Sequence, residues 1–241
     1  MQKYSGLIVN PGIAYGKALI LKSEQELGTS EIKGSNQMEI LQNALSKSAV
    51  RLEEQIRTSH MLYNERISTI FEAHKLMISD PMLLDKAKEY ISSGLTAYDS
   101  YKKAAQEAME LFGRLSSEYM RNRVIDIEDA TDRVLYTIQE ENYEISCSFE
   151  DAKILILEKM KPSVLYNFNK ECVFGFISKT GSYNQHSAVI ARTKDIPGMI
   201  VSEIFDSGIK DGDMVLLDSY QGNIYINPEI DFVNTILEER R

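Results

Sequence analysis

Hydrophobic residues recur at spacings of three and four through the first half of the chain, from about Asn36 to Glu140. This period places them on one face of a helix, so the segment is predicted to be a series of amphipathic helices. The predicted helices begin near Met38, Ile67, Pro81, Thr96 and Asp126. The helix at Thr96 is expected to be long, because its stripe continues to Tyr119. Four or five such helices with short connections bury their stripes best as an antiparallel bundle.

The pattern changes at Lys153 to short apolar runs typical of strands. These runs are Lys153–Leu157, Val173–Ser178, Met199–Val201, Met214–Leu217 and Ile224–Ile226. Helical pieces near 162–169 and 186–194 alternate with them, which indicates an α/β domain. Two N-terminal strands, Ser5–Val9 and Lys17–Leu21, are separated by a turn at Asn10-Pro11-Gly12. They have no nearby partners and are expected to complete the same sheet.

The predicted fold is therefore mixed, α+β or α/β, with a helical bundle inserted into an α/β domain. The α/β domain comprises 1–22 and 150–228, and the bundle comprises 35–141. A hinge is expected near residues 22–35 and 141–152, where the two linkers run side by side. A further helix begins after Asn227-Pro228 and occupies 229–241.

Composition and charge narrow the possible partners. A hydrophobic fraction of 43% and a charged fraction of 26% are ordinary for a globular protein. The net charge of -9 argues against nucleic-acid binding and favours a basic protein partner. No apolar run approaches the roughly 20 residues that cross a bilayer, and no signal segment is evident. We expect a cytoplasmic protein without a membrane partner, whose Cys147 and Cys172 are ordinary thiols.

The strongest candidate for chemistry is His186, which follows a polar, glycine-containing turn from Thr180 and opens a short apolar helix. A helix N-terminus presents unpaired N–H groups and partial positive charge, which favour an anion such as a phosphoryl group. A neutral imidazole is also a competent nucleophile near pH 7. The alternative is a capping or core histidine. No role is assigned to His60.

Five motifs in the right order make the whole chain resemble the N-terminal half of enzyme I, the phosphoenolpyruvate-protein phosphotransferase of the bacterial sugar phosphotransferase system. These motifs are Pro11–Ala18, Ile70–Leu83, His186–Arg192 with Ile196-Pro197, Asp211–Asp213 with Leu217-Asp218, and Ile224–Pro228. The resemblance implies a swivelling phosphohistidine α/β domain. It also implies that His186 takes a phosphoryl group originating from phosphoenolpyruvate and passes it to a histidine of the small carrier protein HPr.

The same resemblance assigns supporting and docking residues. Those supporting the histidine are Gly181, Asn184, Gln185, Ser187 and Arg192. Those expected to dock HPr from the helical bundle are Glu65, Leu76, Met77, Asp80, Leu83, Tyr119 and Arg123. His74 matches a family histidine and is expected to be structural or part of the docking face. Enzyme I continues into a barrel domain that binds phosphoenolpyruvate and Mg²⁺, and residues 229–241 resemble the start of the linker helix to it. No metal or other cofactor is expected in the present segment.

The sequence departs from the family pattern in the residues immediately before His186. Enzyme I typically carries Gly-Gly-Arg-Thr-Ser before it, whereas this chain has Gly181, Ser182, Tyr183, Asn184 and Gln185. Upstream, a family threonine is replaced by Leu165. A cation and three hydroxyl groups are thus lost, although the two amides still supply hydrogen bonds. These departures predict slower transfer or an unusual partner, and they leave open a non-transferring relative that acts as an HPr-binding or regulatory module.

Overall fold

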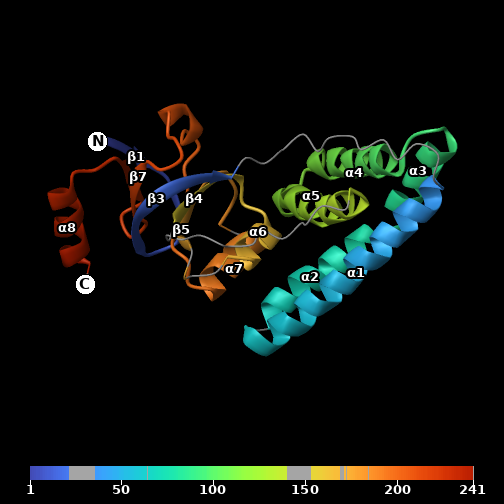
Figure 1. The fold of residues 1–241 in the computed structure, drawn as a ribbon, viewed down its shortest axis with the longest axis horizontal. Helices are drawn as coiled ribbons and strands as arrows, with labels where there is room; N and C mark the ends of the chain where they lie inside the picture. The colour runs from blue at the N-terminus through green and yellow to red at the C-terminus, as the bar shows by residue number, and fades with distance from the viewer. Residues whose placement is uncertain are drawn as a thin grey trace. The chain divides into compact units, whose positions relative to one another are not determined.

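The computed structural model describes residues 1–21, 36–63, 65–139, 153–168, 171, 173–183 and 185–240, apart from the side chains of residues 118, 119 and 122. The chain divides into two compact units, one comprising Met1–Gln25 with Ile145–Arg241 and the other comprising Glu26–Glu144. The predicted hinge segments, 22–35 and 141–152, lie outside the described residues. The mixed fold class is confirmed, with a helical unit and an α/β unit (Figure 1).

The helical unit consists of α1 (Gln37–Leu62), α2 (Glu65–Ile78), α3 (Pro81–Ser92), α4 (Ala97–Gly113) and α5 (Glu118–Ile138). Side chains at the N-caps begin three of these helices, since Asn36, Asp80 and Thr96 each accept hydrogen bonds from first-turn N–H groups. Helices α1 and α2 pack side by side, and α5 contacts both of them as well as α4.

One helix boundary differs from the prediction. The hydrophobic stripe predicts a helix that continues from Thr96 to Tyr119, whereas α4 ends at Gly113 and α5 already begins at Glu118. The intervening turn is stabilised by Arg121, whose Nη1 donates to the carbonyls of Leu115 at 3.0 Å and Ser116 at 2.7 Å. The spacing of the apolar residues continues across this turn, so periodicity alone does not reveal it.

The interior of the helical unit contains charged side chains as well as apolar ones. Asp126, Asp129 and Arg133 of α5 are at most 2% exposed. His74 of α2 is fully buried, and its Nδ1 lies 3.9 Å from Oδ2 of Asp129. This burial makes His74 a structural residue and removes it from the surface available for docking.

The α/β unit contains one eight-stranded sheet of order β1-β8-β7-β3-β4-β5-β6-β2. Its strands are β1 (Gln2–Ser5), β2 (Leu7–Asn10), β3 (Ile13–Leu21), β4 (Lys153–Lys159), β5 (Val173–Thr180), β6 (Gly198–Ile200), β7 (Met214–Asp218) and β8 (Asn223–Ile226). The pairs β3–β4, β4–β5 and β5–β6 are parallel, and the others are antiparallel. The sheet thus joins residues from both ends of the chain.

Gly6 interrupts the predicted strand Ser5–Val9, because β1 ends at Ser5 and β2 begins at Leu7, and the sequence did not predict the first part of β1. These two strands form opposite edges of the sheet although one residue separates them, so the sheet curls until its edges meet at Gly6. The Gly6 N–H donates to the Gly222 carbonyl at 3.1 Å. A Cβ at Gly6 would lie 2.1 Å from the Ile200 carbonyl oxygen, so only glycine fits here.

Helices complete the α/β unit. Two short helices, α6 (Pro162–Tyr166) and α7 (His186–Thr193), pack against each other, and α7 also contacts β2. The last helix, α8 (Ile230–Glu239), covers Leu216 and Tyr225 with its buried Val233. Arg240 just beyond α8 lies 3.5 Å from the buried carboxylate of Asp218. None of the described helices combines the length and the apolar character needed to cross a bilayer.

Candidate functional site

His186 occupies the first position of α7, immediately after the loop that leaves β5. Its side chain is half-buried. Gln185 is the N-cap residue of the helix; its backbone is extended, and its carbonyl accepts from the N–H groups of Ala188 at 3.1 Å and Val189 at 3.3 Å. The histidine therefore lies at a helix N-terminus, as the sequence predicts, where backbone dipoles favour an anionic group.

The loop before the histidine is closed by its own polar groups. The Gln185 side-chain oxygen accepts from the Ser182 N–H at 3.1 Å, and the Gln185 N–H donates to the Ser182 carbonyl at 3.2 Å. Gly181 is confined, because a Cβ there would lie 3.2 Å from atoms of both Ile200 and Met160. Gly181 and Gln185 thus shape the loop, while Asn184 lies outside the described residues.

Arg192, in the last turn of α7, reaches back to the same loop. Its Nη1 donates to the Tyr183 carbonyl at 3.1 Å and to the Val9 carbonyl of β2 at 3.4 Å. Its guanidinium carbon lies 4.3 Å from the centroid of the Tyr183 ring, in a cation–π contact. Arg192 is therefore linked to the loop and to the edge strand, and Tyr183 joins the site although the sequence indicated only a lost cation there.

Ser187, next to the histidine, is fully buried, and among the described residues its hydroxyl group has no hydrogen-bond partner. A buried hydroxyl without a partner is costly, so its presence beside the candidate nucleophile calls for an explanation.

A buried lysine that sequence reasoning missed fixes α6 beside α7. The Lys194 ammonium donates to the carbonyls of Leu165 at 3.3 Å and Tyr166 at 2.5 Å, and also to that of Phe168. These carbonyls end α6, where the helix dipole favours a cation. Leu165, at the position of the family threonine, is fully buried. No sequence signal could have found this contact, because it depends on how two short helices pack.

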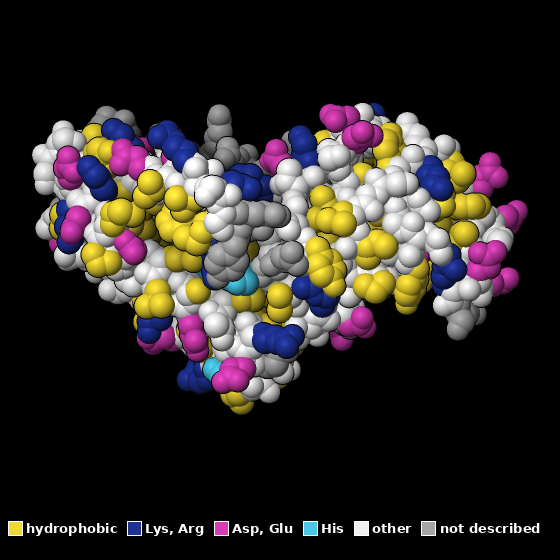
Figure 2. Space-filling view, turned by 180° about the vertical axis from the view of Figure 1, so that it is seen from behind, with side chains coloured by type: hydrophobic (Ala, Val, Ile, Leu, Met, Phe, Trp, Pro, Cys, Tyr) yellow, Lys and Arg dark blue, Asp and Glu magenta, His cyan; other side chains and the backbone are white. Residues whose placement is uncertain are grey.

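The predicted docking residues differ in exposure. Leu76 is 73% exposed, and Glu65 and Asp80 are exposed as well. Met77 is half-buried, whereas Leu83 is only 5% exposed and belongs mainly to the interior. Figure 2 shows that hydrophobic side chains reach the surface in groups between charged ones.

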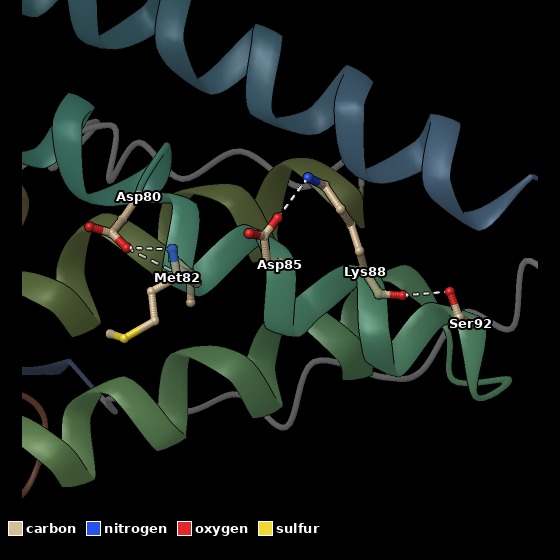
Figure 3. A network of polar contacts seen from close by, with 6 residues as sticks. Asp80, Met82, Asp85, Lys88 and Ser92 are labelled. Carbon is tan, nitrogen blue, oxygen red and sulfur yellow. Dashed lines mark hydrogen bonds and ion pairs between the residues drawn. The ribbon is translucent and has the colours of Figure 1, made fainter.

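Asp80 and Arg123 also have structural contacts. The Asp80 carboxylate accepts from the Met82 N–H at 2.9 Å, so it caps α3 (Figure 3). Arg123 Nη1 lies 3.5 Å from the Asp126 carboxylate. The side chain of Tyr119 is outside the described part of the chain.

A groove between α3 and α4, which the sequence did not suggest, has a volume of about 340 Å³. Its apolar part includes Met82 and Leu111, which are 52% and 51% exposed, together with the buried Leu83. Lys86, Glu107, Glu110 and Arg114 contribute its charged lining. Within the described residues, no cluster of three or more His, Cys, Asp or Glu side chains could hold a metal ion.

A histidine-bearing α/β unit joined to a helical unit is a fold already seen among solved structures. A solution structure of an enzyme I protein superposes with a TM-score of 0.69 at 24% identity, covering 98% of this chain and 97% of that one. The N-terminal domain of a nitrogen-type enzyme I gives a TM-score of 0.59 at 18% identity, covering 98% of each chain. These similarities establish the fold.

Sequence comparison then gives the family. Residues 5–123 match the family of the N-terminal domain of PEP-utilising enzymes, and residues 149–222 match the mobile domain of PEP-utilising enzymes. Both matches are to domains of PEP-utilising enzymes, and together they span most of the chain. The chain therefore belongs to the PEP-utilising enzymes and corresponds to the N-terminal part of enzyme I.

Two relatives show how much of the enzyme is represented. The phosphoenolpyruvate-protein phosphotransferase of Buchnera aphidicola subsp. Baizongia pistaciae is 29% identical over 243 residues, covering 98% of this chain and 42% of the relative. That of Bacillus subtilis (strain 168) is 30% identical over 244 residues, covering 99% and 42%. The chain thus spans about two fifths of the length of these relatives.

Proposed function

We propose that this chain is the phosphoryl-carrier part of enzyme I, in which His186 receives a phosphoryl group originating from phosphoenolpyruvate and passes it to a histidine of HPr. The observation that carries the proposal is the position of His186, half-buried at the first residue of α7 behind a hydrogen-bonded loop. Family membership supports it, because the relatives are named phosphoenolpyruvate-protein phosphotransferases.

The chemistry needs few groups. In the exchange between His186 and the HPr histidine, a neutral imidazole nitrogen of the acceptor attacks phosphorus, one N–P bond forms as the donor N–P bond breaks, and no oxidation or reduction occurs. Such transfers depend mainly on positioning and on stabilisation of the phosphoryl charge. The N-terminal dipole of α7 supplies favourable charge, and the buried Ser187 hydroxyl is adjacent in sequence.

The rest of the enzyme is part of the same proposal. Transfer between two histidines needs no metal, so we assign no cofactor to this chain and assign Mg²⁺ and the phosphoenolpyruvate site to a C-terminal barrel domain. A cytoplasmic location belongs to the same proposal.

The helical unit is proposed as the HPr-docking surface. Leu76, which is 73% exposed, provides an apolar anchor, and the exposed carboxylates of Glu65 and Asp80 supply negative charge. HPr of the resembling family is basic around its own histidine, so these charges would speed encounter and fix orientation.

The decisive test incubates the chain with phosphorylated HPr and measures acid-labile phosphate by intact mass. We expect the wild type to gain one phosphoryl group and His186→Ala to gain none. His60→Ala is the matched control, because His60 is an exposed residue in the last turn of α1. Phosphate retained by His186→Ala would sink the assignment. A stable HPr complex without transfer would instead favour the alternative, an HPr-binding or regulatory module.

Docking is tested separately by calorimetric titration with HPr. Asp80→Asn keeps a side chain that caps helices as well as aspartate does but removes the charge, so affinity should fall about threefold. Asp85→Asn on the same helix is the control, since Asp85 is exposed and pairs with Lys88 at 3.0 Å (Figure 3). Leu76→Ala should weaken binding about tenfold or more. Equal effects of the two aspartate variants would argue against docking through Asp80.

A further inference from the structure

Tyr183, in the loop before His186, contacts the guanidinium group of Arg192 through both its backbone carbonyl and its ring. The two ends of this loop, at 181–185, are fixed by the packing around Gly181 and by the start of α7 at Gln185. Between them Tyr183 is 48% exposed, so little apolar packing restrains it. Its restraint comes instead from Arg192, through the backbone carbonyl at 3.1 Å and the aromatic ring at 4.3 Å.

Arg192 also contacts the sheet, at an irregularity in β2. The pairing of β2 with β6 shifts between Ile8 and Asn10, which leaves Val9 out of the regular register. Such a bulge re-aims backbone groups, and the Val9 carbonyl accepts from Arg192 at 3.4 Å. One guanidinium therefore links the edge strand, the end of α7 and the loop before His186. Lysine could not replace Arg192 fully, because the planar guanidinium group both donates hydrogen bonds to the two carbonyls and stacks on the Tyr183 ring.

We propose that Arg192 and Tyr183 are a positioning pair, which holds the loop at 181–185 against the bulge at Val9 and thereby presents the His186 imidazole in one orientation. The proposal rests on the phosphoryl-carrier function and deepens it by naming what orients the nucleophile. Neither residue needs to touch the phosphoryl group. Tyr183 acts through its ring and its carbonyl, so the hydroxyl group is dispensable.

Positioning matters for this reaction because the attacking nitrogen must lie in line with the bond that breaks. A displacement of about 1 Å can cost about a hundredfold in rate. A loop released at Tyr183 would still be tied at Gly181 and Gln185, so the loss should be smaller than that. We expect a lower rate of transfer without a change in the affinity for HPr, whose proposed docking residues are all in the helical unit.

The test measures single-turnover transfer from phosphorylated HPr to the full 241-residue chain. Arg192→Lys keeps the positive charge but loses the fork. It should lower the maximal single-turnover rate about tenfold, with the half-saturating HPr concentration within about twofold of the wild type. Tyr183→Ala should lower that rate about threefold. Tyr183→Phe should behave as the wild type, and the pH midpoint of transfer should be the same in all variants. Combining Tyr183→Ala with Arg192→Lys should add little to Arg192→Lys alone.

A second measurement separates the pair from the carrier function. The imidazole NMR signals of His186 in the unphosphorylated chain should form one sharp set in the wild type and in Tyr183→Phe. They should be broadened or doubled in Arg192→Lys and Tyr183→Ala. A wild type that accepts no phosphate would defeat the carrier function, while these spectra would still decide whether the pair orients the ring.

Three outcomes would overturn the proposed positioning role of Arg192 and Tyr183. The first is an Arg192→Lys variant with the wild-type rate and spectrum. The second is a uniform rise in hydrogen exchange throughout the α/β unit of that variant, which would indicate a general structural role. The third is a Tyr183→Phe variant as slow as Tyr183→Ala, which would assign the effect to the hydroxyl group.

Discussion

The two units bury polar side chains in different ways. In the helical unit the buried polar groups include ionisable side chains on neighbouring helices, such as His74 of α2 and Asp129 and Arg133 of α5. In the α/β unit, two buried polar side chains bond to backbone carbonyls of segments distant in the sequence. Ser219 donates to the carbonyls of Asn10 at 3.0 Å and Gly12 at 2.8 Å, and Lys194 donates to those that end α6.

Backbone geometry explains the difference. A helix satisfies its own interior N–H and C=O groups, so a buried hydroxyl group inside the bundle bonds to a carbonyl of its own helix, as Ser59 does to Gln55 at 2.6 Å and Thr131 to Ile127 at 2.8 Å. The irregular segments of the α/β unit leave carbonyls unpaired, and side chains satisfy them. Polar substitutions should therefore act within the bundle through unpaired charge, and within the α/β unit through the placement of loops.

The largest effect is expected for Asp129→Ala in the helical unit. The change removes the buried carboxylate whose Oδ2 lies 3.9 Å from Nδ1 of the buried His74. Breaking a buried charge cluster typically costs about 3–5 kcal/mol in the free energy of unfolding. Denaturation followed by hydrogen exchange should show the loss in the helical unit.

The control is Asp85→Ala, which removes an exposed carboxylate and should cost less than about 1 kcal/mol. If Asp129→Ala costs no more than this control, charge pairing is not what holds the bundle interior together.

The next effect tests closure of the sheet in the α/β unit. Gly6→Ala places a Cβ 2.1 Å from the Ile200 carbonyl oxygen, and backbone must move to relieve that contact. We expect a loss of about 3 kcal/mol, measured by chemical denaturation. Gly113→Ala in α4 is the matched control, because a Cβ there meets no atom within 4 Å. It should be neutral or stabilise by up to about 1 kcal/mol. Equal stability of the two variants would contradict the closure at Gly6.

Sequence periodicity predicted the helical unit well because its contacts repeat every three or four residues. It missed the break after Gly113, where Arg121 supplies hydrogen bonds that no apolar spacing encodes. In the α/β unit the strands other than β1 were predicted but not their order, because pairing joins residues as distant as Ser5 and Asn223. The division of the first strand at Gly6 also depends on that pairing.

In the candidate site, too, local features were predicted and contacts between distant segments were not. The position of His186 at the start of a helix was predicted, because a polar turn before an apolar helix is a local signal. The contact of Arg192 with Tyr183 and the capping of α6 by Lys194 were not, because the carbonyl of Val9 and the end of α6 come near only after folding. From the sequence, Tyr183 was interpreted only as the loss of the family arginine. In the structure its ring contacts the guanidinium group of Arg192.

A smaller effect compares one buried serine from each unit. Ser187 and Ser100 are both fully buried, and neither hydroxyl has a partner among the described residues. Replacing either by alanine removes an unpaired polar group and should raise the free energy of unfolding by about 1 kcal/mol. Only Ser187→Ala should slow phosphoryl transfer from HPr, if its hydroxyl bonds the phosphoryl group of His186. Unchanged transfer in both variants would leave Ser187 without a role in the site.

The smallest expected effect is a pH dependence in the α/β unit. Hydrogen bonds from the Asn227 side chain at 3.1 Å and the Lys210 N–H at 2.8 Å lower the pKa of Asp213. A carboxyl group whose pKa is lower in the folded state stabilises that state above its unfolded pKa, near 4. This stabilisation is lost as the pH falls through the folded value.

Asp213→Asn should therefore lower the midpoint of urea denaturation slightly at pH 7 and approach the wild type at the acid end of the titration. Tyr90→Phe in the helical unit is the control. The hydrogen bond with Glu107 raises the pKa of Tyr90, so any stabilisation from that group is lost as the pH rises, and the acid limb should not change. An Asp213→Asn variant with the same offset from the wild type at every pH would show that its contacts matter only as hydrogen bonds and not through ionisation.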